Sequence, residues 1–275
     1  MIERIVLTGA GGKLGSYLRG PISNLCKVLI STDIKEPIGD LHINESFYKA
    51  DLSNFDEILK ILKGATMVCH FGALVDETPF HKMLGPNFIG SYNIWESAKQ
   101  NNVKRIIYAS SIHAVGMYPK KQTLVPSINH NPDTFYGLSK CFTEDLAKLY
   151  YEKHKVETVC LRIASCAPVT TARSLSSWLS YDDLVMLVTR SIDTLVTGFS
   201  VLYGVSNNTR KNIDNSENSY IGYVPKDDAE IYAEQILKSD LSQELGDTGN
   251  NFHGGAFAST ALGISPLKKM KIVND

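Results

Sequence analysis

Short apolar runs alternate with amphipathic stretches along the first two-thirds of this 275-residue chain. The apolar runs are rich in Val and Ile and are bounded by Gly, Asp, Asn or Ser, as buried strands are. They predict strands at Arg4–Thr8, Lys27–Thr32, Thr66–His70, Arg105–Ser110 and Thr158–Ile163. The amphipathic stretches predict helices at Lys13–Arg19, Phe55–Leu62, Asn87–Asn101 and Tyr136–His154. Strands that alternate with helices indicate an α/β fold, a doubly wound parallel sheet of Rossmann type with helices on both faces.

The pattern also predicts which face of the longest helix is buried. In Tyr136–His154, one face carries Phe142, Leu146, Leu149 and Tyr150, and we expect this face to meet the core. The charged residues Glu144, Asp145, Lys148 and Glu152 fall elsewhere on the helix.

After Ile163 the pattern changes character. Residues Ala164–Ser180 are rich in Ser, Thr, Ala and Cys and predict an irregular loop. Helices are predicted at Asp182–Thr197 and near Lys226–Ser239, with a polar stretch, Ser206–Ser219, between them. The last segment, Ala256–Asp275, carries no clear pattern.

Composition narrows the class of protein. The chain has 28 Lys and Arg against 29 Asp and Glu, so no basic surface predicts binding to nucleic acid or to a membrane. Five cysteines without a Cys-x-x-Cys spacing predict reduced, mostly buried thiols in a cytoplasmic protein and no metal site. No apolar run is long enough to cross a bilayer, and a strand begins almost at Met1, so we expect no signal peptide.

A glycine-rich loop joins the first strand to the first helix. Gly9, Gly12 and Gly15 would let the backbone turn tightly against a pyrophosphate, with Lys13 and Leu14 between them. Asp33, eighteen residues past Gly15, would accept hydrogen bonds from the ribose hydroxyls and repel a 2′-phosphate. This spacing favours NAD over NADP, although Lys13 could help to hold that phosphate. The alternative for Asp33 is a strand-end cap.

Two further segments are predicted to border the cofactor. Asp51 and Leu52 follow an apolar run and would flank the adenine. Phe71, Gly72 and Ala73 follow the strand that ends at His70 and would pass under the cofactor, since ligands bind at the carboxyl edge of such sheets.

A Ser…Tyr-x-x-x-Lys set predicts hydride transfer at a carbon that bears oxygen. Lys140 lies one helical turn after Tyr136, so its ammonium would lower the pKa of the tyrosine and make it a base, while Ser111 polarises the substrate oxygen. A second copy, Tyr151 with Lys155, lies at the far end of the helix, where we expect surface. Asn87 would either hold a water or backbone group near Lys140 or cap its helix.

With these residues, the chain resembles the extended branch of the short-chain dehydrogenase/reductase superfamily, the NAD-dependent epimerase/dehydratase family, over nearly its whole length. More specific segments resemble the uronate dehydrogenases within it, which oxidise C1 of glucuronate or galacturonate with NAD. These segments are Ser110-Ser111-Ile112-His113, Tyr136-Gly137-x-Ser139-Lys140-Cys141-Phe142, Arg162-Ile163-x-Ser165-Cys166, Arg173-x-Leu175-Ser176-x-Trp178, Gly222-Tyr223-x-Pro225-Lys226-Asp227 and Gly254-Gly255-x-Phe257.

The resemblance implies roles for particular residues. Ser111, Tyr136 and Lys140 would be catalytic. Arg173 would pair with the sugar carboxylate, as a planar guanidinium does. The other substrate-binding residues it implies are Val75, Ile112, His113, Ser165 and Phe257. Ile112 and Val75 depart from the family, which has Asn and Ser there, so two polar contacts to the sugar become apolar.

The resemblance also implies an organisation. Residues 1–163 would form the NAD-binding core, with residues 164–275 as a small substrate-binding lid packed on it. The helices Asn87–Asn101 and Tyr136–His154 would pair two subunits into a homo-oligomer.

Two alternatives remain open at the level of sequence. One is a nucleotide-sugar epimerase or dehydratase, although about a hundred residues after Ile163 are few to clasp a nucleotide. The other is a non-catalytic NAD-binding sensor, which would tolerate loss of Tyr136 or Lys140.

Overall fold

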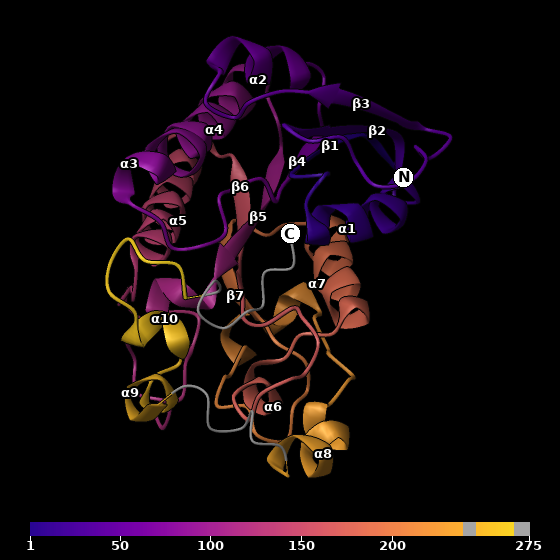
Figure 1. Cartoon of the computed structure of the whole chain (residues 1–275). Coiled ribbons are helices and arrows are strands. Elements are labelled where there is room, and N and C mark those ends of the chain that lie inside the picture. The colour runs from indigo at the N-terminus through magenta and orange to yellow at the C-terminus, as the bar shows by residue number, and fades with distance from the viewer. Residues whose placement is uncertain (239–245, 267–275) are drawn as a thin grey trace.

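Seven parallel strands form one sheet in the computed structural model, which describes residues 1–238 and 246–266 (Figure 1). Their order across the sheet is β3-β2-β1-β4-β5-β6-β7, so the winding reverses between β1 and β4. The strands are β1 (Ile2–Thr8), β2 (Cys26–Asp33), β3 (Glu45–Lys49), β4 (Met67–His70), β5 (Arg105–Ser111), β6 (Glu157–Ile163) and β7 (Phe199–Gly204). Such a reversal opens a crevice at the carboxyl ends of the two central strands.

Helices cover both faces of this sheet (Figure 1). On one face, α1 (Lys13–Ser23) and α7 (Tyr181–Asp193) bury Leu18 and Leu187 in a core with the strands. On the other, α2 (Phe55–Ile61), α4 (Gly90–Gln100) and α5 (Phe135–His154) bury a second core around Trp95. The predicted doubly wound α/β fold is therefore confirmed.

The sheet is accompanied by shorter elements, of which α6 (Ser174–Ser177) and α10 (Ala256–Ser259) lie toward the end where β5, β6 and β7 finish (Figure 1). A short helix and a π-helical turn, α3 (Phe80–Met83) and Leu84–Ile89, lead into α4. The others are α8 (Ala233–Leu237), α9 (Gly246–Asn251) and the 3-10 turns Ile112–Val115, Ser216–Ile221 and Ala229–Tyr232. Within residues 1–238 and 246–266, no helix is both long and apolar enough to cross a membrane.

Several predicted boundaries needed correction. All five predicted strands form, but β3 and β7 were not predicted. The predicted loop Ala164–Ser180 contains α6 and a bridge between Ser165 and Trp178. The helix expected at Asp182–Thr197 ends at Asp193, and the one expected near Lys226–Ser239 comprises the turn from Ala229 and then α8, with Ser239 outside the described residues. In Ala256–Asp275, α10 forms, and 267–275 lie outside the described residues.

The buried face of α5 matches the predicted one only in part: Tyr150 is buried in the second core and Leu146 packs against it. Phe142 and Leu149 are 38% and 49% exposed, whereas Glu144 is 2% exposed. Glu144 accepts hydrogen bonds from Arg162 on β6, with Nη2 2.8 Å from Oε2, and from Ser110 and His130. The helix therefore presents a polar stripe to the sheet because a buried arginine neutralises the carboxylate there.

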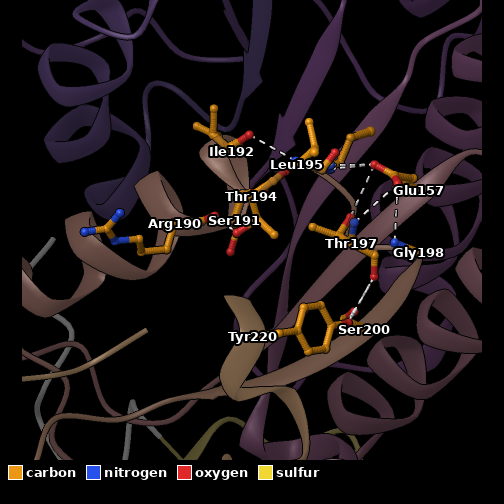
Figure 2. Close-up of polar contacts among 11 residues, drawn as sticks. Glu157, Arg190, Ser191, Ile192, Thr194, Leu195, Thr197, Gly198, Ser200 and Tyr220 are labelled. Carbon is orange, nitrogen blue, oxygen red and sulfur yellow. Dashed lines mark hydrogen bonds and ion pairs between the residues drawn. The ribbon is translucent and has the colours of Figure 1, made fainter. Parts of the chain in front are cut away.

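A second buried arginine fixes the amino end of the sheet. Arg105 is fully buried, and its guanidinium donates to Glu157 and to the carbonyls that end α7, those of Ser191, Ile192, Thr194 and Leu195. Figure 2 shows Glu157 facing Thr197 and Gly198, whose N–H groups donate to its carboxylate. The carbonyls at the end of α7 have no hydrogen-bond donor within the helix, and the Arg105 guanidinium supplies one. These bonds hold α7 against β5 and β6.

Candidate active site

Glycine packing shapes the loop between β1 and α1. Gly9 has a φ of +75°, and a Cβ there would lie 2.5 Å from the backbone nitrogen of Gly72. A Cβ on Gly15 would lie 1.9 Å from the carbonyl oxygen of Gly9. Only glycine fits both positions, because the loop after β4 and the first turn of α1 press directly on β1's end.

The amino end of α1 is open for an anion. Gly12 is its N-cap and provides no side-chain cap, the first turn carries no acidic residue, and Lys13 is exposed beside it. Leu14 packs inward against the first core. An eleven-residue helix with free N–H groups at this end fits the pyrophosphate of a dinucleotide.

Asp33 at the end of β2 stands beside this loop. Its Oδ2 accepts from the Gly11 backbone N–H at 3.0 Å and its Oδ1 from that of Lys35 at 3.0 Å. The strand-end capping role is thus present in the structure. A carboxylate has about four acceptor sites, so these two bonds leave room for ribose hydroxyls, and that contact stays a prediction.

The two bordering segments meet at the same edge. Gly72 donates its N–H to Thr8 Oγ1 at 3.1 Å, and Phe71 to the Thr8 carbonyl at 3.2 Å, so both lie against β1's end, with Ala73 next in the chain. Leu52 packs on Gly72, where a Cβ would be 2.9 Å from its Cδ1. Asp51 is exposed and its Oδ1 accepts from Ser53. The structure therefore brings the predicted cofactor residues to one crevice.

Ser111, Tyr136 and Lys140 converge at the carboxyl end of β5. Ser111 ends the strand, and its hydroxyl is close enough to that of Tyr136 to favour the phenolate. Tyr136 lies in the first turn of α5, which begins here because Thr134 Oγ1 accepts from the Gly137 N–H at 3.0 Å. Lys140 Nζ lies 5.4 Å from the centroid of the Tyr136 ring and donates to the Ala109 carbonyl at 2.7 Å.

Burial is the largest influence on the pKa values of Tyr136 and Lys140. It raises the pKa of Tyr136 to about 12, although the nearby Ser111 hydroxyl favours the phenolate. Burial also lowers the pKa of Lys140 to about 7, against the charge of Glu144, which raises it. In the protein without its cofactor, the pKa of Tyr136 is therefore raised and not lowered as expected from Lys140. The Lys140 ammonium donates to the Ala109 carbonyl, and the effect of burial on Tyr136 is larger than any effect of the lysine charge.

Asn87 neither caps a helix nor reaches Lys140. It lies inside the π-helical turn, because the helical region begins earlier, at Phe80. Its amide bonds both backbone groups of Leu74, at 2.8 and 3.0 Å, and donates to Ser139 Oγ at 3.0 Å. Asn87 therefore fixes the loop after β4 to α5, one residue before the catalytic lysine.

His113 and Phe257 form one wall beside Tyr136. Their rings stack at 4.0 Å between centroids, and the Tyr136 ring lies 5.8 Å from that of His113. Asp133 Oδ2 lies 2.7 Å from His113 Nδ1 and so orients the imidazole. Phe257 thus lies beside Tyr136, and its contact with a substrate stays a prediction.

Arg173 faces a cavity of about 70 Å³ that Ile112 and Ala164 also line. Its guanidinium donates to the His253 carbonyl, with Nη2 at 2.7 Å and Nε at 3.3 Å. Burial lowers the pKa of Arg173, and nearby Asp133 partly offsets this. Among the described residues Arg173 makes no ion pair, so it is free to receive a carboxylate.

Val75 and Ser165 are the two predicted substrate-binding residues that remain. Val75 is 60% exposed, on the loop after β4. Ser165 is half-buried, and its backbone pairs with α6 through Ser177 and Leu179. Their contact with a substrate stays a prediction.

Two residues of the site escaped sequence reasoning. Asp133, which holds His113, precedes the helix cap without any motif of its own. Glu77 is fully buried and accepts from the N–H groups of Tyr136 at 2.9 Å and of Gly263 at 2.7 Å. It ties the amino end of α5, where a negative charge is favoured, to the C-terminal segment. No local signal marks either carboxylate, because the partners are distant in the chain.

Two other observations concern alternative sites. A wider cavity of about 470 Å³ lies at the amino end of the sheet, lined by Thr194, Leu195 and Tyr220 among others. Its polar atoms are used internally: the Tyr220 hydroxyl lies 2.6 Å from Ser200 Oγ, and Figure 2 shows the ring directed at that residue. Within the described residues, no group of three or more His, Cys, Asp or Glu is placed to hold a metal.

Known proteins resemble this chain over nearly its full length. The model of the NAD dependent epimerase/dehydratase family matches residues 5–169. A uronate dehydrogenase from Pseudomonas putida is 36% identical, over 93% of this chain and 96% of that protein. Another from Agrobacterium fabrum is 34% identical, over 95% and 98%. A solved structure of a uronate dehydrogenase variant from Agrobacterium tumefaciens, complexed with NAD, matches with a TM-score of 0.90 and 34% identity, over 95% and 98% of the two chains.

Proposed function

This chain belongs to the NAD dependent epimerase/dehydratase family and, within it, to the uronate dehydrogenases, and on that premise we propose that it oxidises C1 of a hexuronate with NAD. The observation that carries the proposal is the pairing of a complete Ser111, Tyr136 and Lys140 set with an arginine that has no acidic partner among the described residues. A sugar acid supplies both the C1 hydroxyl and the carboxylate that this arrangement calls for.

The residues divide the chemistry as follows. Arg173 binds the carboxylate and sets the orientation of the sugar. Ser111 donates a hydrogen bond to the C1 oxygen, and Tyr136 takes the proton of that hydroxyl. Lys140, held by the Ala109 carbonyl, stabilises the phenolate with its charge. The glycine loop and Asp33 would hold NAD, which would supply the hydride acceptor for C1 and a positive charge that favours the ionised tyrosine.

The proposal extends to organisation and partners. Residues 1–163 would hold the cofactor and residues 164–275 the substrate. We further propose a homo-oligomer formed through α4 and α5, supported by exposed apolar side chains along these helices and α3: Phe80, Leu84, Tyr92, Leu138, Phe142 and Leu149. A cytoplasmic location is supported by five free cysteines, four of them buried.

Neither alternative is favoured. An epimerase must enclose a nucleotide beside the sugar, whereas the cavity at Arg173 measures about 70 Å³. A sensor would not need the buried catalytic set that this chain keeps.

The first test mixes the purified protein with NAD and follows NADH absorbance. The substrates are D-glucuronate, D-galacturonate, D-glucose and D-galactose. We expect signal with the uronates and little with the neutral sugars. Signal with the neutral sugars alone would keep the chemistry and discard the acid substrate, and cofactor that stays tightly bound through purification would favour an epimerase instead.

A further inference from the structure

A pair of segments supports the Arg173 cavity from one side. Residues 116–122 run antiparallel to residues 251–254, with a bridge between Pro119 and Phe252. Lys120 donates its backbone N–H to the Asn251 carbonyl at 2.8 Å, and His253 donates its own to the Tyr118 carbonyl at 3.0 Å. The His253 carbonyl is also the acceptor for Arg173. The same backbone pairing therefore positions both Lys120 and Arg173.

The cavity is lined by cations and by no acidic residue. Lys120, Arg173 and Arg210 all line it. Arg210 is neutralised by Glu230, which it contacts through two nitrogens at 2.7 and 2.8 Å. Among the described residues Lys120 makes no ion pair, and its ammonium has no hydrogen-bond partner there. Arg173 also makes no ion pair among them, although Asp133, which binds His113, lies near enough to stabilise its charge. Burial, followed by the charges of Arg173 and Arg210, lowers the pKa of Lys120.

Two partly buried cations that face one space without an ion-pair partner are unfavourable unless an anion joins them. The space, about 70 Å³, is roughly twice the share of one water molecule in the liquid, about 30 Å³. It has room for a compact oxyanion. Ile112, which directly follows Ser111, forms part of its wall. The anion would therefore sit one side chain away from the catalytic serine.

We propose that Lys120 is a second substrate-binding cation, which holds the acidic group of the sugar together with Arg173. This inference rests on the proposed function and deepens it. Two cations around one oxyanion compensate for the apolar Ile112, because substrate binding then depends more on charge and less on hydroxyl contacts. We assign the site to the carboxylate of a hexuronate. A hexose 6-phosphate also carries a negatively charged group on C6 of the sugar.

The test compares Lys120→Gln with Lys121→Gln, a neighbouring exposed lysine that does not line the cavity. We expect Lys120→Gln to raise KM for the uronate roughly 10- to 100-fold, the range for a lost charge-assisted hydrogen bond, with kcat changed much less. KM for a neutral aldose should not move, and Lys120→Arg should restore much of the affinity for the acid. Equal KM values in Lys120→Gln and Lys121→Gln would overturn the proposal.

A binding measurement separates this inference from the proposed function. With NAD at saturation, D-glucuronate, glucose 6-phosphate and inorganic phosphate are titrated into each variant and the shift in Tm is recorded. If the wild-type protein turns over no uronate, the proposed function fails, but a Tm shift by these anions that Lys120→Gln loses and Lys121→Gln keeps would still support Lys120 as an anion ligand. If the wild-type protein oxidises a uronate and Lys120→Gln shows the same KM and the same Tm shift, the proposed function holds and Lys120 has no part in substrate binding. A shift by glucose 6-phosphate larger than that by glucuronate would reassign the occupant to a phosphate.

Discussion

Turnover depends most directly on the Tyr136 hydroxyl, which is the base of the proposed reaction. Tyr136→Phe is expected to lower kcat by about 10²–10⁴-fold, the usual contribution of a positioned proton acceptor, while the protein still binds NAD. The chain supplies its own control, because Tyr151 and Lys155 repeat the same spacing at the end of α5, where Lys155 is exposed. Tyr151→Phe should leave kcat unchanged. An active Tyr136→Phe variant would remove this residue from the role of base.

Residues of the site differ in how far they could be predicted. Gly9, Gly15, Tyr136 and Lys140 belong to motifs of short spacing, in which the chemistry is set within one loop or one helical turn. Asp133 and Glu77 could not be predicted in this way. Each acts on groups that only the folded chain brings close, His113 for the first and the amino end of α5 for the second.

At the scale of elements, α5 is attached to the sheet by a buried ion pair. Burial alone would raise the pKa of Glu144, but the Arg162 charge and the hydrogen bonds around it lower that pKa to about 2. Glu144→Gln leaves Arg162 buried without a counter-charge, so we expect the free energy of unfolding to fall by about 3–5 kcal/mol. Asp145→Asn is the matched control, since that side chain is 75% exposed. Urea unfolding measures both, and equal losses would contradict the ion pair's structural role.

The same pair explains why the hydrophobic pattern predicted the buried face of α5 only in part, with Tyr150 and Leu146 at the core and Phe142 and Leu149 outside it. Periodicity assumes that apolar side chains turn inward, and it assigned Phe142 and Leu149 to the core. In the structure the sheet-facing stripe is polar because Arg162 lies beneath it, and the two apolar side chains are left exposed. The edge strand β3 was missed for a related reason: only one of its five residues is buried, so it lacks the Val- and Ile-rich run that marked the central strands.

For the whole molecule, acid pH is expected to weaken the fold through His70. This residue is 1% exposed, with Nδ1 2.7 Å from Thr8 Oγ1 and its ring stacked on Tyr108. Burial, reinforced by the charge of Lys140, lowers its pKa from 6.5 to about 3. The unfolded chain therefore binds the proton more tightly than the folded one. The contribution of His70 to stability is fully present above pH 6.5 and is lost toward pH 3, by at most about 1.4 kcal/mol per pH unit for one proton.

The window from pH 6.5 down to 4.5 separates the effect of His70 from that of Glu144, which begins to destabilise the fold only below its ordinary pKa of 4.5. His253, whose pKa burial also lowers, adds a share in the same window. His70→Asn should flatten the slope of unfolding free energy against pH there, leaving the share of His253. His42→Asn, at an exposed position, should keep the wild-type slope. A His70→Asn slope equal to that of the wild type would mean that the histidine accepts its proton in the folded state, and that Thr8 and the rings around it do not hold it neutral.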